Sequence, residues 1–252
     1  MEILSLQHVG MTYYTKTAET QALRDLSFSV QQKEFVAVLG PSGCGKTTVL
    51  SLISGLLRPT EGEILLNGKP LNGPSSSVGY MLQHDHLFPW RNIWQNVTLG
   101  LEIQKKRTPE HLAYAEQLLS KYGLGDFRTR YPSQLSGGMR QRAALIRTLT
   151  LQPDLLLLDE PFSALDFQTR LQVCDDVYSI IRSEHKTAVL VTHDISEAIS
   201  MADRIVLLSS RPATVKNVHP VRLSGDTPLS RREAAGFSAL FECIWRDLNE
   251  EG

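Results

Sequence analysis

Residues 40–47 read GPSGCGKT and match the pattern G-x-x-x-x-G-K-[ST], a loop that wraps nucleotide phosphates. Glycines let backbone N–H groups approach the phosphates, and the helix that follows adds the positive end of its dipole. Lys46 is able to reach the β- and γ-phosphates, and Thr47 offers a hydroxyl to Mg²⁺. Residues 35–39 are typical of a buried strand and residues 48–53 of a helix, so we predict a strand–loop–helix unit.

Two carboxylates follow the apolar run at residues 155–158, which is typical of another buried strand. Asp159 is suited to hold Mg²⁺, directly or through water, and Glu160 to polarise an attacking water. Two acids at the start of a loop are weak evidence by themselves. Downstream of a phosphate loop they become strong evidence, because the metal needs this partner.

A second helix start that suits an anion lies in residues 135–142, LSGGMRQR. Ser136 occupies an N-cap position, and Gly137 and Gly138 leave backbone N–H groups open. An ordinary helix cap is the alternative. Two phosphate-binding helix starts do not easily serve one nucleotide from the same side, so we expect a dimer that pairs one site with the other.

His193 follows the apolar run at residues 188–191. A lone histidine is more often structural than catalytic. Because parallel strands end at the same sheet edge, we expect His193 near Glu160, where it would contact the γ-phosphate.

The bulk properties exclude several classes of protein. The formal net charge of the 252 residues is −1, which gives no sign of a nucleic-acid partner. No apolar run approaches the ~18–20 residues of a membrane span, and the first residues lack the pattern of a signal peptide. Three widely spaced cysteines argue against a disulfide framework or a zinc site. We therefore expect a cytosolic protein that reaches a membrane through a partner.

The elements around these motifs predict an α/β fold. Residues 3–9, 26–30 and 63–68 favour an antiparallel sheet around the phosphate loop, and residues 78–82 form another strand. Residues 83–150 are mainly helical, with a helix start at Thr108 and a stop at Gly123.

Beyond this block, we expect a helix at residues 169–183 and a short amphipathic stretch within residues 237–248.

In its motifs the chain resembles the ATP-binding subunits of ABC transporters. In family order across about residues 1–220, the matches are Walker A at 40–47, the Q-loop at Gln83, the signature at 135–139, Walker B at 155–159 followed by Glu160, the D-loop at 163–166 and the switch histidine at His193. One departure is Met139, where the general signature has glutamine. The anion-facing residues before it are intact, so we expect little functional loss.

The resemblance implies a P-loop NTPase core with a mixed sheet, an antiparallel β subdomain and an inserted helical subdomain. We expect the ATPase domain at residues 1–224, with the core and β subdomain at 1–82 and 151–224 and the helical subdomain at about 84–150. A C-terminal tail with a short amphipathic helix follows at residues 225–252.

The resemblance also implies a set of site residues for ATP and Mg²⁺. The expected nucleotide-binding residues are Tyr13, Gly40, Pro41, Ser42, Gly43, Cys44, Gly45, Lys46, Thr47, Thr48, Ser136, Gly137, Gly138 and Asp166. The expected catalytic residues are Lys46, Gln83, Glu160 and His193, and the expected metal-binding residues are Thr47, Gln83 and Asp159. Tyr13 would stack on adenine, although Tyr14 is adjacent. Thiol reagents at Cys44 should block nucleotide binding.

By the same resemblance, two copies pair head to tail and sandwich two ATP molecules, and a groove beside Gln83 receives a short helix of a permease. A substrate-binding protein is then an indirect partner, and the chain is peripheral at the cytoplasmic face of the inner membrane. Trp90 and Trp94 either help to form that groove or simply pack.

Finer matches point to the nitrate, aliphatic sulfonate and taurine importer branch, which also includes importers of pyrimidine-like thiamine precursors. They lie at residues 87–93, 96–97 and 99–102 and in the tail at Phe237, Leu240, Ile244 and Trp245.

The alternatives are a nucleotide-gated module that does not hydrolyse, a non-transport ABC ATPase acting on DNA or ribosomes, and a small-molecule kinase. Intact Glu160 and His193 argue against the first, and near-neutral charge with a short helical block argues against the second. A kinase would not need the Ser136 site.

Overall fold

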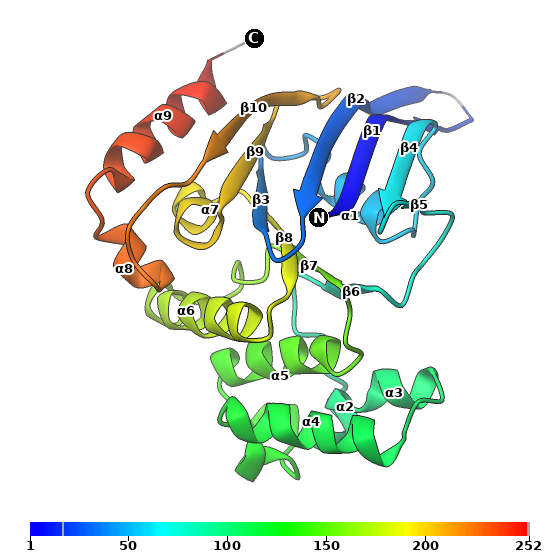
Figure 1. Ribbon diagram of the computed structural model, residues 1–252, viewed down its shortest axis with the longest axis vertical. Helices are drawn as coiled ribbons and strands as arrows, with labels where there is room; N and C mark the ends of the chain where they lie inside the picture. Colours follow the sequence, from blue (N-terminus) through cyan, green and yellow to red (C-terminus); the bar gives the residue numbers. More distant parts are fainter. Residues whose placement is uncertain (17, 251–252) are drawn as a thin grey trace.

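A computed structural model describes residues 1–16 and 18–250 (Figure 1). The first of its two sheets is antiparallel and contains four strands in the order β2-β1-β4-β5. Their bounds are β1 Glu2–Tyr14, β2 Glu19–Gln31, β4 Glu61–Leu66 and β5 Lys69–Pro70. The predicted Asn-Gly turn joins β4 to β5, with positive φ angles of 51° at Asn67 and 70° at Gly68.

The second sheet contains six strands in the order β10-β9-β3-β8-β7-β6 and is the central sheet of the molecule. The bounds are β3 Phe35–Leu39, β6 Val78–Met81, β7 Leu155–Asp159, β8 Thr187–Thr192, β9 Arg204–Leu208 and β10 Val215–Pro220. All neighbours pair in parallel except β10, which runs antiparallel to β9. Every residue of β3, β7 and β8 is buried, which explains why these strands are continuous apolar runs.

Alternate residues of β3 enter two different hydrophobic cores. Val36 and Val38 pack toward the antiparallel sheet and helix α1 (Lys46–Ile53), whereas Ala37 and Leu39 pack on the opposite face. Helices α6 (Phe167–Ser183) and α7 (Ile195–Met201) contribute to that second core. The central sheet is therefore covered on both faces, as its apolar strands require.

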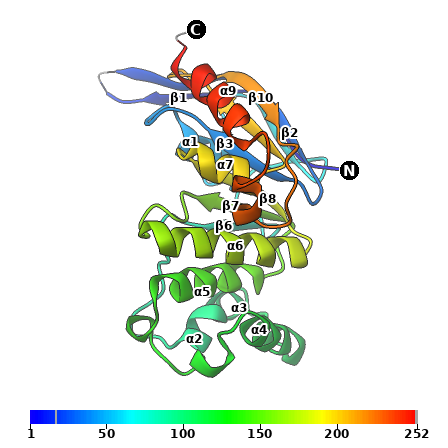
Figure 2. The same cartoon turned by 90° about the vertical axis from the view of Figure 1, so that its left-hand side faces the viewer.

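A group of helices forms a separate layer at the bottom of Figures 1 and 2. It contains α2 (Ile93–Val97), α3 (Leu99–Ile103), α4 (Pro109–Lys121) and α5 (Gly137–Leu149), with short 3₁₀ turns at Gly125–Phe127 and Pro132–Gln134. The predicted start of α4 is confirmed, because the Thr108 side chain accepts a hydrogen bond from the N–H of His111. Gly123 follows the end of α4 with φ +73°.

The chain after β10 forms α8 (Pro228–Arg232) and α9 (Phe237–Asn249). The predicted amphipathic stretch is therefore a helix, and it packs on α7 (Figure 2). Ile244 is completely buried there. The last two residues of the predicted tail, 251 and 252, lie outside the described residues, and the predicted domain boundaries remain a prediction.

The predicted fold class is confirmed, but several element boundaries were wrong. Both β1 and β2 are longer than the short alternating runs at residues 3–9 and 26–30, because they pair with each other along their length. Helix α6 begins at Phe167, two residues before the predicted start, because Asp166 caps it and accepts a hydrogen bond from the N–H of Thr169. Strands β9 and β10 and helices α7 and α8 were not predicted individually.

Candidate nucleotide-binding site

The predicted phosphate loop connects β3 to α1, so its sequence context is confirmed. Gly43 and Gly45 have φ angles of +74° and +125°, a backbone region that other residues rarely adopt. Gly45 is the N-cap of α1 and supplies no side-chain hydrogen bond to the helix. The first N–H groups of α1 are thus open to an anion, which fits the phosphates of a nucleotide.

Lys46 follows this loop as the first residue of α1 and is 6% exposed. Its Nζ donates hydrogen bonds of 2.9 Å to the backbone oxygens of Gly40 and Pro41. The ammonium is therefore folded back over the loop, with neutral carbonyls as partners. A charged phosphate oxygen is a stronger acceptor than a carbonyl, so the loop is ready to exchange one for the other.

Tyr13 at the end of β1 lies next to the same helix start. Its hydroxyl is 3.1 Å from the Oγ1 atom of Thr48, whereas Tyr14 is more exposed. Of the two adjacent tyrosines, Tyr13 is thus held beside the loop, where a flat base would have a ring to stack on. Its contact with adenine remains a prediction.

Asp159 ends β7 and is mostly buried. Burial raises the pKa of its carboxyl group, while a 3.1 Å hydrogen bond from the Tyr80 hydroxyl favours the ionised form. A cation would offset the cost of burying this charge. Together with the exposed hydroxyl of Thr47, the carboxylate supplies the oxygen ligands that Mg²⁺ prefers.

Glu160 and His193 approach each other at the carboxyl ends of β7 and β8, as expected. Glu160 Oε1 lies 3.2 Å from His193 Nδ1. The Glu160 N–H donates to the oxygen of Val191 at 2.9 Å, and its φ is +43°. A positive φ is uncommon for glutamate and persists where the surrounding structure holds the backbone, as the hydrogen bond to Val191 does here.

Gln83 follows β6 and reaches the segment after Glu160. Its Nε2 donates to Ser163 Oγ at 3.2 Å, and Ser163 Oγ donates to the backbone oxygen of Glu160 at 3.0 Å. The matched Q-loop and D-loop residues are thus connected to the backbone of Glu160, the candidate catalytic residue. Asp166, a predicted nucleotide contact, is exposed and caps α6.

The predicted second anion site lies at the N-terminus of α5. Ser136 accepts a hydrogen bond from the Met139 N–H, so the ordinary cap is present as well. Gly138 has a further reason to be glycine: a Cβ atom there would lie 2.8 Å from Val173 Cγ2 on α6. Met139 packs against the hydrophobic core, which explains why an apolar residue is accommodated at this position.

The signature residues border a groove of about 450 Å³ that Asp166 also lines. Helix α5 lies in the bottom layer of the molecule, whereas α1 and its loop lie above it in both views (Figures 1 and 2). The two predicted anion sites are therefore not brought together within one chain.

Three contacts at the site were missed by sequence reasoning. Tyr80 holds Asp159. Arg211 donates to the oxygen of Gly43 at 2.8 Å, and Arg147 on α5 donates to the oxygen of Asp85 beside Gln83. The motifs carry no signal for these residues, because β-strand pairing and helix packing bring them in from distant parts of the chain.

The comparisons with known proteins agree with this geometry. A family model described as "ABC transporter" matches residues 23–163. The chain belongs to the ABC transporter family. It is an ATP-binding cassette of the kind that forms the ATPase subunits of these transporters. In the described part of this cassette, no helix is long and apolar enough to span a bilayer.

The relatives of this ABC cassette include importer subunits. An uncharacterized ABC transporter ATP-binding protein, YtlC of Bacillus subtilis (strain 168), is 49% identical, with 99% of this chain and 96% of YtlC covered. The taurine import ATP-binding protein TauB of Shigella sonnei is 41% identical over 99% of this chain and 98% of TauB. The nitrate import ATP-binding protein NrtD of Synechocystis is 39% identical over 90% and 86%. The predicted resemblance to this branch is confirmed.

A solved structure supports the same family. The dimeric ATP-binding cassette MJ0796, bound to ADP and Pi in a post-hydrolysis state, superimposes with a TM-score of 0.72 at 31% identity. The match covers 87% of this chain and 99% of that one. The cassette fold is therefore shared with a protein that holds ADP and Pi as a dimer.

Proposed function

We propose that this cassette binds and hydrolyses ATP to power the import of a small solute of the nitrate, sulfonate or taurine kind. The observation that carries the proposal is the convergence of the Lys46 loop, the buried Asp159 carboxylate and the Glu160–His193 pair at one edge of the central sheet. A phosphate cradle, a metal ligand and a general base are the parts that nucleotide hydrolysis requires.

In this proposal, the loop N–H groups and Lys46 hold the phosphates, Thr48 lies at the helix start, and Tyr13 stacks on the base. Thr47, Asp159 and Gln83 would hold Mg²⁺, which would neutralise negative charge on the phosphates. Two features of the site suit these ligands: the start of α1 has no side-chain cap and is open to phosphate, and the carboxylate of Asp159 is partly desolvated, which suits a cation.

Glu160 polarises the attacking water and accepts its proton. Its backbone is anchored to β8 through Val191, so the carboxylate is held at the sheet edge. His193 lies 3.2 Å from this carboxylate and is mostly exposed, which leaves its ring free to contact the γ-phosphate. Gln83 and Ser163 link the backbone oxygen of Glu160 to the segment after β6, so that this segment would respond when the site is occupied.

A second copy completes the site in the head-to-tail dimer. The groove at Ser136, Gly137 and Gly138 would face the phosphate loop of the other subunit, with Asp166 at the interface. Two observations support this arrangement: the two anion sites lie apart within one chain, and the related cassette MJ0796 forms a dimer with nucleotide.

A permease is the proposed membrane partner, which would place the cassette at the cytoplasmic face of the inner membrane. Trp90 follows the Q-loop and is 70% exposed, so it is available for such a contact. Arg140 and Arg147 on α5 bind the side chain and the backbone oxygen of Asp85, respectively. A displacement of the Q-loop by the permease would therefore move the helix that carries the signature. A substrate-binding protein would act through the permease, and no nucleic acid is expected.

The test is the Glu160→Gln variant, which removes the base but keeps the size of the side chain. We expect retained ATP binding and hydrolysis slowed about 10²–10⁴-fold. Glu242→Gln, at an exposed position of α9, is the matched control and should hydrolyse at the normal rate. Unchanged turnover in the Glu160 variant would remove this residue from its role. ATP binding by the normal protein without hydrolysis would favour the nucleotide-gated module.

The transport assignment is tested separately by recovering the cassette with its partners from membranes. Co-purification of a multi-spanning permease is the expected result. Recovery of ribosomes or DNA-bound proteins alone would favour the non-transport alternative, even if ATP hydrolysis were confirmed.

A further inference from the structure

Helix α9 and strand β10 bring together a histidine, a cysteine and an aspartate, none of which belongs to the predicted nucleotide site. One ligand atom each of His219, Cys243 and Asp247 lies within 4.8 Å of the other two. We propose that these three residues bind a borderline-soft divalent metal ion of the Zn²⁺ class. The proposal does not depend on the proposed import function.

The strongest support is the environment of the His219 side chain, because this residue is only 7% exposed. Its Nε2 atom is buried and makes no aligned hydrogen bond, although it lies only 2.9 Å from Asp247 Oδ2. A buried imidazole nitrogen normally has a hydrogen-bond partner along its lone-pair or N–H direction. A metal ion between that nitrogen and the Asp247 carboxylate would give His219 Nε2 the aligned partner that it lacks.

The two other ligands are presented by one face of α9. Cys243 and Asp247 are four residues apart and therefore lie one above the other on the helix. Asn217 on β10 donates a 2.7 Å hydrogen bond to Asp247 Oδ2, which orients the carboxylate. An orienting partner of this kind commonly accompanies metal-binding carboxylates.

The chemistry of this set selects the metal. Thiolate and imidazole ligands favour Zn²⁺ over Mg²⁺ or Ca²⁺, which prefer oxygen ligands. With bonds of about 2.0–2.3 Å, tetrahedral Zn²⁺ separates its ligand atoms by roughly 3.3–3.7 Å. The distance of 2.9 Å between His219 Nε2 and Asp247 Oδ2 would therefore have to increase by a few tenths of an ångström when the ion binds. The exposed position of Cys243 leaves room for water as the fourth ligand.

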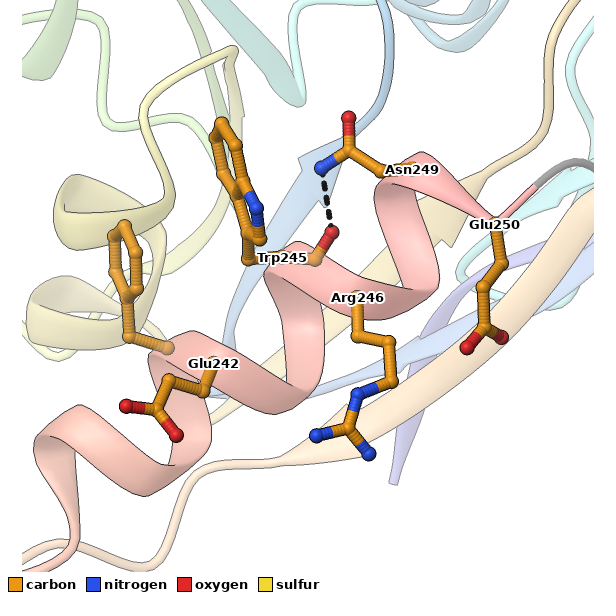
Figure 3. Close-up of a pocket in the computed structure, with 6 residues that line it drawn as sticks. Glu242, Trp245, Arg246, Asn249 and Glu250 are labelled. Atoms are coloured by element: carbon orange, nitrogen blue, oxygen red, sulfur yellow. Dashed lines mark hydrogen bonds between the residues drawn. The ribbon is translucent and has the colours of Figure 1, made fainter.

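This site differs from the cavity on the outer face of α9. That cavity, of about 640 Å³, is lined by Trp245 and its neighbours but by neither Cys243 nor Asp247 (Figure 3). A metal ion held by both α9 and β10 would fasten the C-terminal helix to the central sheet, because His219 belongs to β10 and pairs with Ile205 of β9.

The test uses the metal-free full chain without nucleotide or Mg²⁺, titrated with Co²⁺ and then with Zn²⁺. We expect one Co²⁺ per chain with a thiolate-to-cobalt absorption band, which Zn²⁺ displaces. Cys243→Ser and His219→Ala should abolish the band. Asn217→Ala should weaken binding about 10–100-fold, because it removes the partner that orients Asp247.

His8→Ala is the matched control, since His8 also pairs with an aspartate, Asp25, at 2.7 Å. It should keep the band. Because Cys243 is exposed, its serine variant is expected to fold, and its circular dichroism and thermal midpoint check this. Absence of the band in the normal chain, or its persistence in folded Cys243→Ser, would overturn the proposal.

Discussion

Replacing Ile244 by alanine tests how α9 is attached to the rest of the cassette. Ile244 has 0% exposed surface and belongs to the core on the α7 side of the central sheet. Its neighbours on α9, Phe237, Leu240, Phe241 and Leu248, are only partly buried. Ile244 is therefore the residue of this helix whose truncation should weaken docking most.

The magnitude follows from the lost burial and the cavity left behind. Truncating a buried isoleucine to alanine typically costs 2–5 kcal/mol. Because α9 lies at the edge of the molecule and can move inward, we expect the lower part of that range, about 2–3 kcal/mol. The higher helix propensity of alanine offsets only a few tenths of this amount.

Thermal unfolding and limited proteolysis together measure the effect. For a chain of this size, 1 kcal/mol corresponds to roughly 2–4 °C, so the midpoint should fall by about 4–12 °C if α9 unfolds with the core. If α9 opens by itself, the loss instead appears as faster cleavage near Gly236, before the first residue of α9. Either result shows that the burial of Ile244 stabilises the packing of α9 against the rest of the cassette.

Trp245→Ala is the matched control on the same helix. Trp245 is 55% exposed, so its truncation should lower the free energy of unfolding by less than about 1 kcal/mol despite the larger side chain. The reasoning is refuted if Ile244→Ala changes neither the midpoint nor the cleavage rate. Equal destabilisation by the two variants would also contradict it.

Two further outcomes are expected. Hydrogen bonds from Lys121, Tyr122 and Tyr114 outweigh burial and lower the pKa of the Glu184 carboxyl group below its ordinary value of 4.5, so the ionised folded form is favoured. Glu184→Gln should therefore cost about 1–3 kcal/mol at neutral pH, and denaturant titrations should show this difference shrinking as the pH falls below 4.5. In metal-free protein, a maleimide should modify exposed Cys243 at least about tenfold faster than Cys44, which is 2% exposed and whose pKa is raised by burial. Peptide mapping should show that loss of ATP binding follows modification of Cys44, and equal rates at the two thiols would contradict this expectation.

The motif residues were readable from the sequence because their chemistry depends on local spacing. The loop around Lys46 needs glycines at fixed positions, and the structure shows the positive φ angles that explain Gly43 and Gly45. Continuous apolar runs predicted the buried parallel strands that end at Asp159 and near His193, and the structure brings Glu160 and His193 to the same edge. Their catalytic roles remain predictions until the variants are measured.

Element boundaries depended on pairing and capping that a short window does not contain. The first two strands extend well beyond their alternating cores, because each supplies the hydrogen-bond partners of the other. Asp166 shows the same limit on a smaller scale. Its motif match indicated a nucleotide contact, whereas in the folded chain its side chain also fixes the start of α6.

The sequence by itself determined the family, the phosphate loop and the order of the motifs, because these depend on residues that are adjacent along the chain. Tertiary structure alone decided that Tyr80 supports Asp159, that Arg147 holds the Q-loop and that His219 meets Cys243 and Asp247. The physical reason is that sheet order and helix packing determine these contacts. Cysteine spacing predicted no zinc site, and it carries no information on the position of His219 beside Cys243, which the packing of α9 on β10 determines.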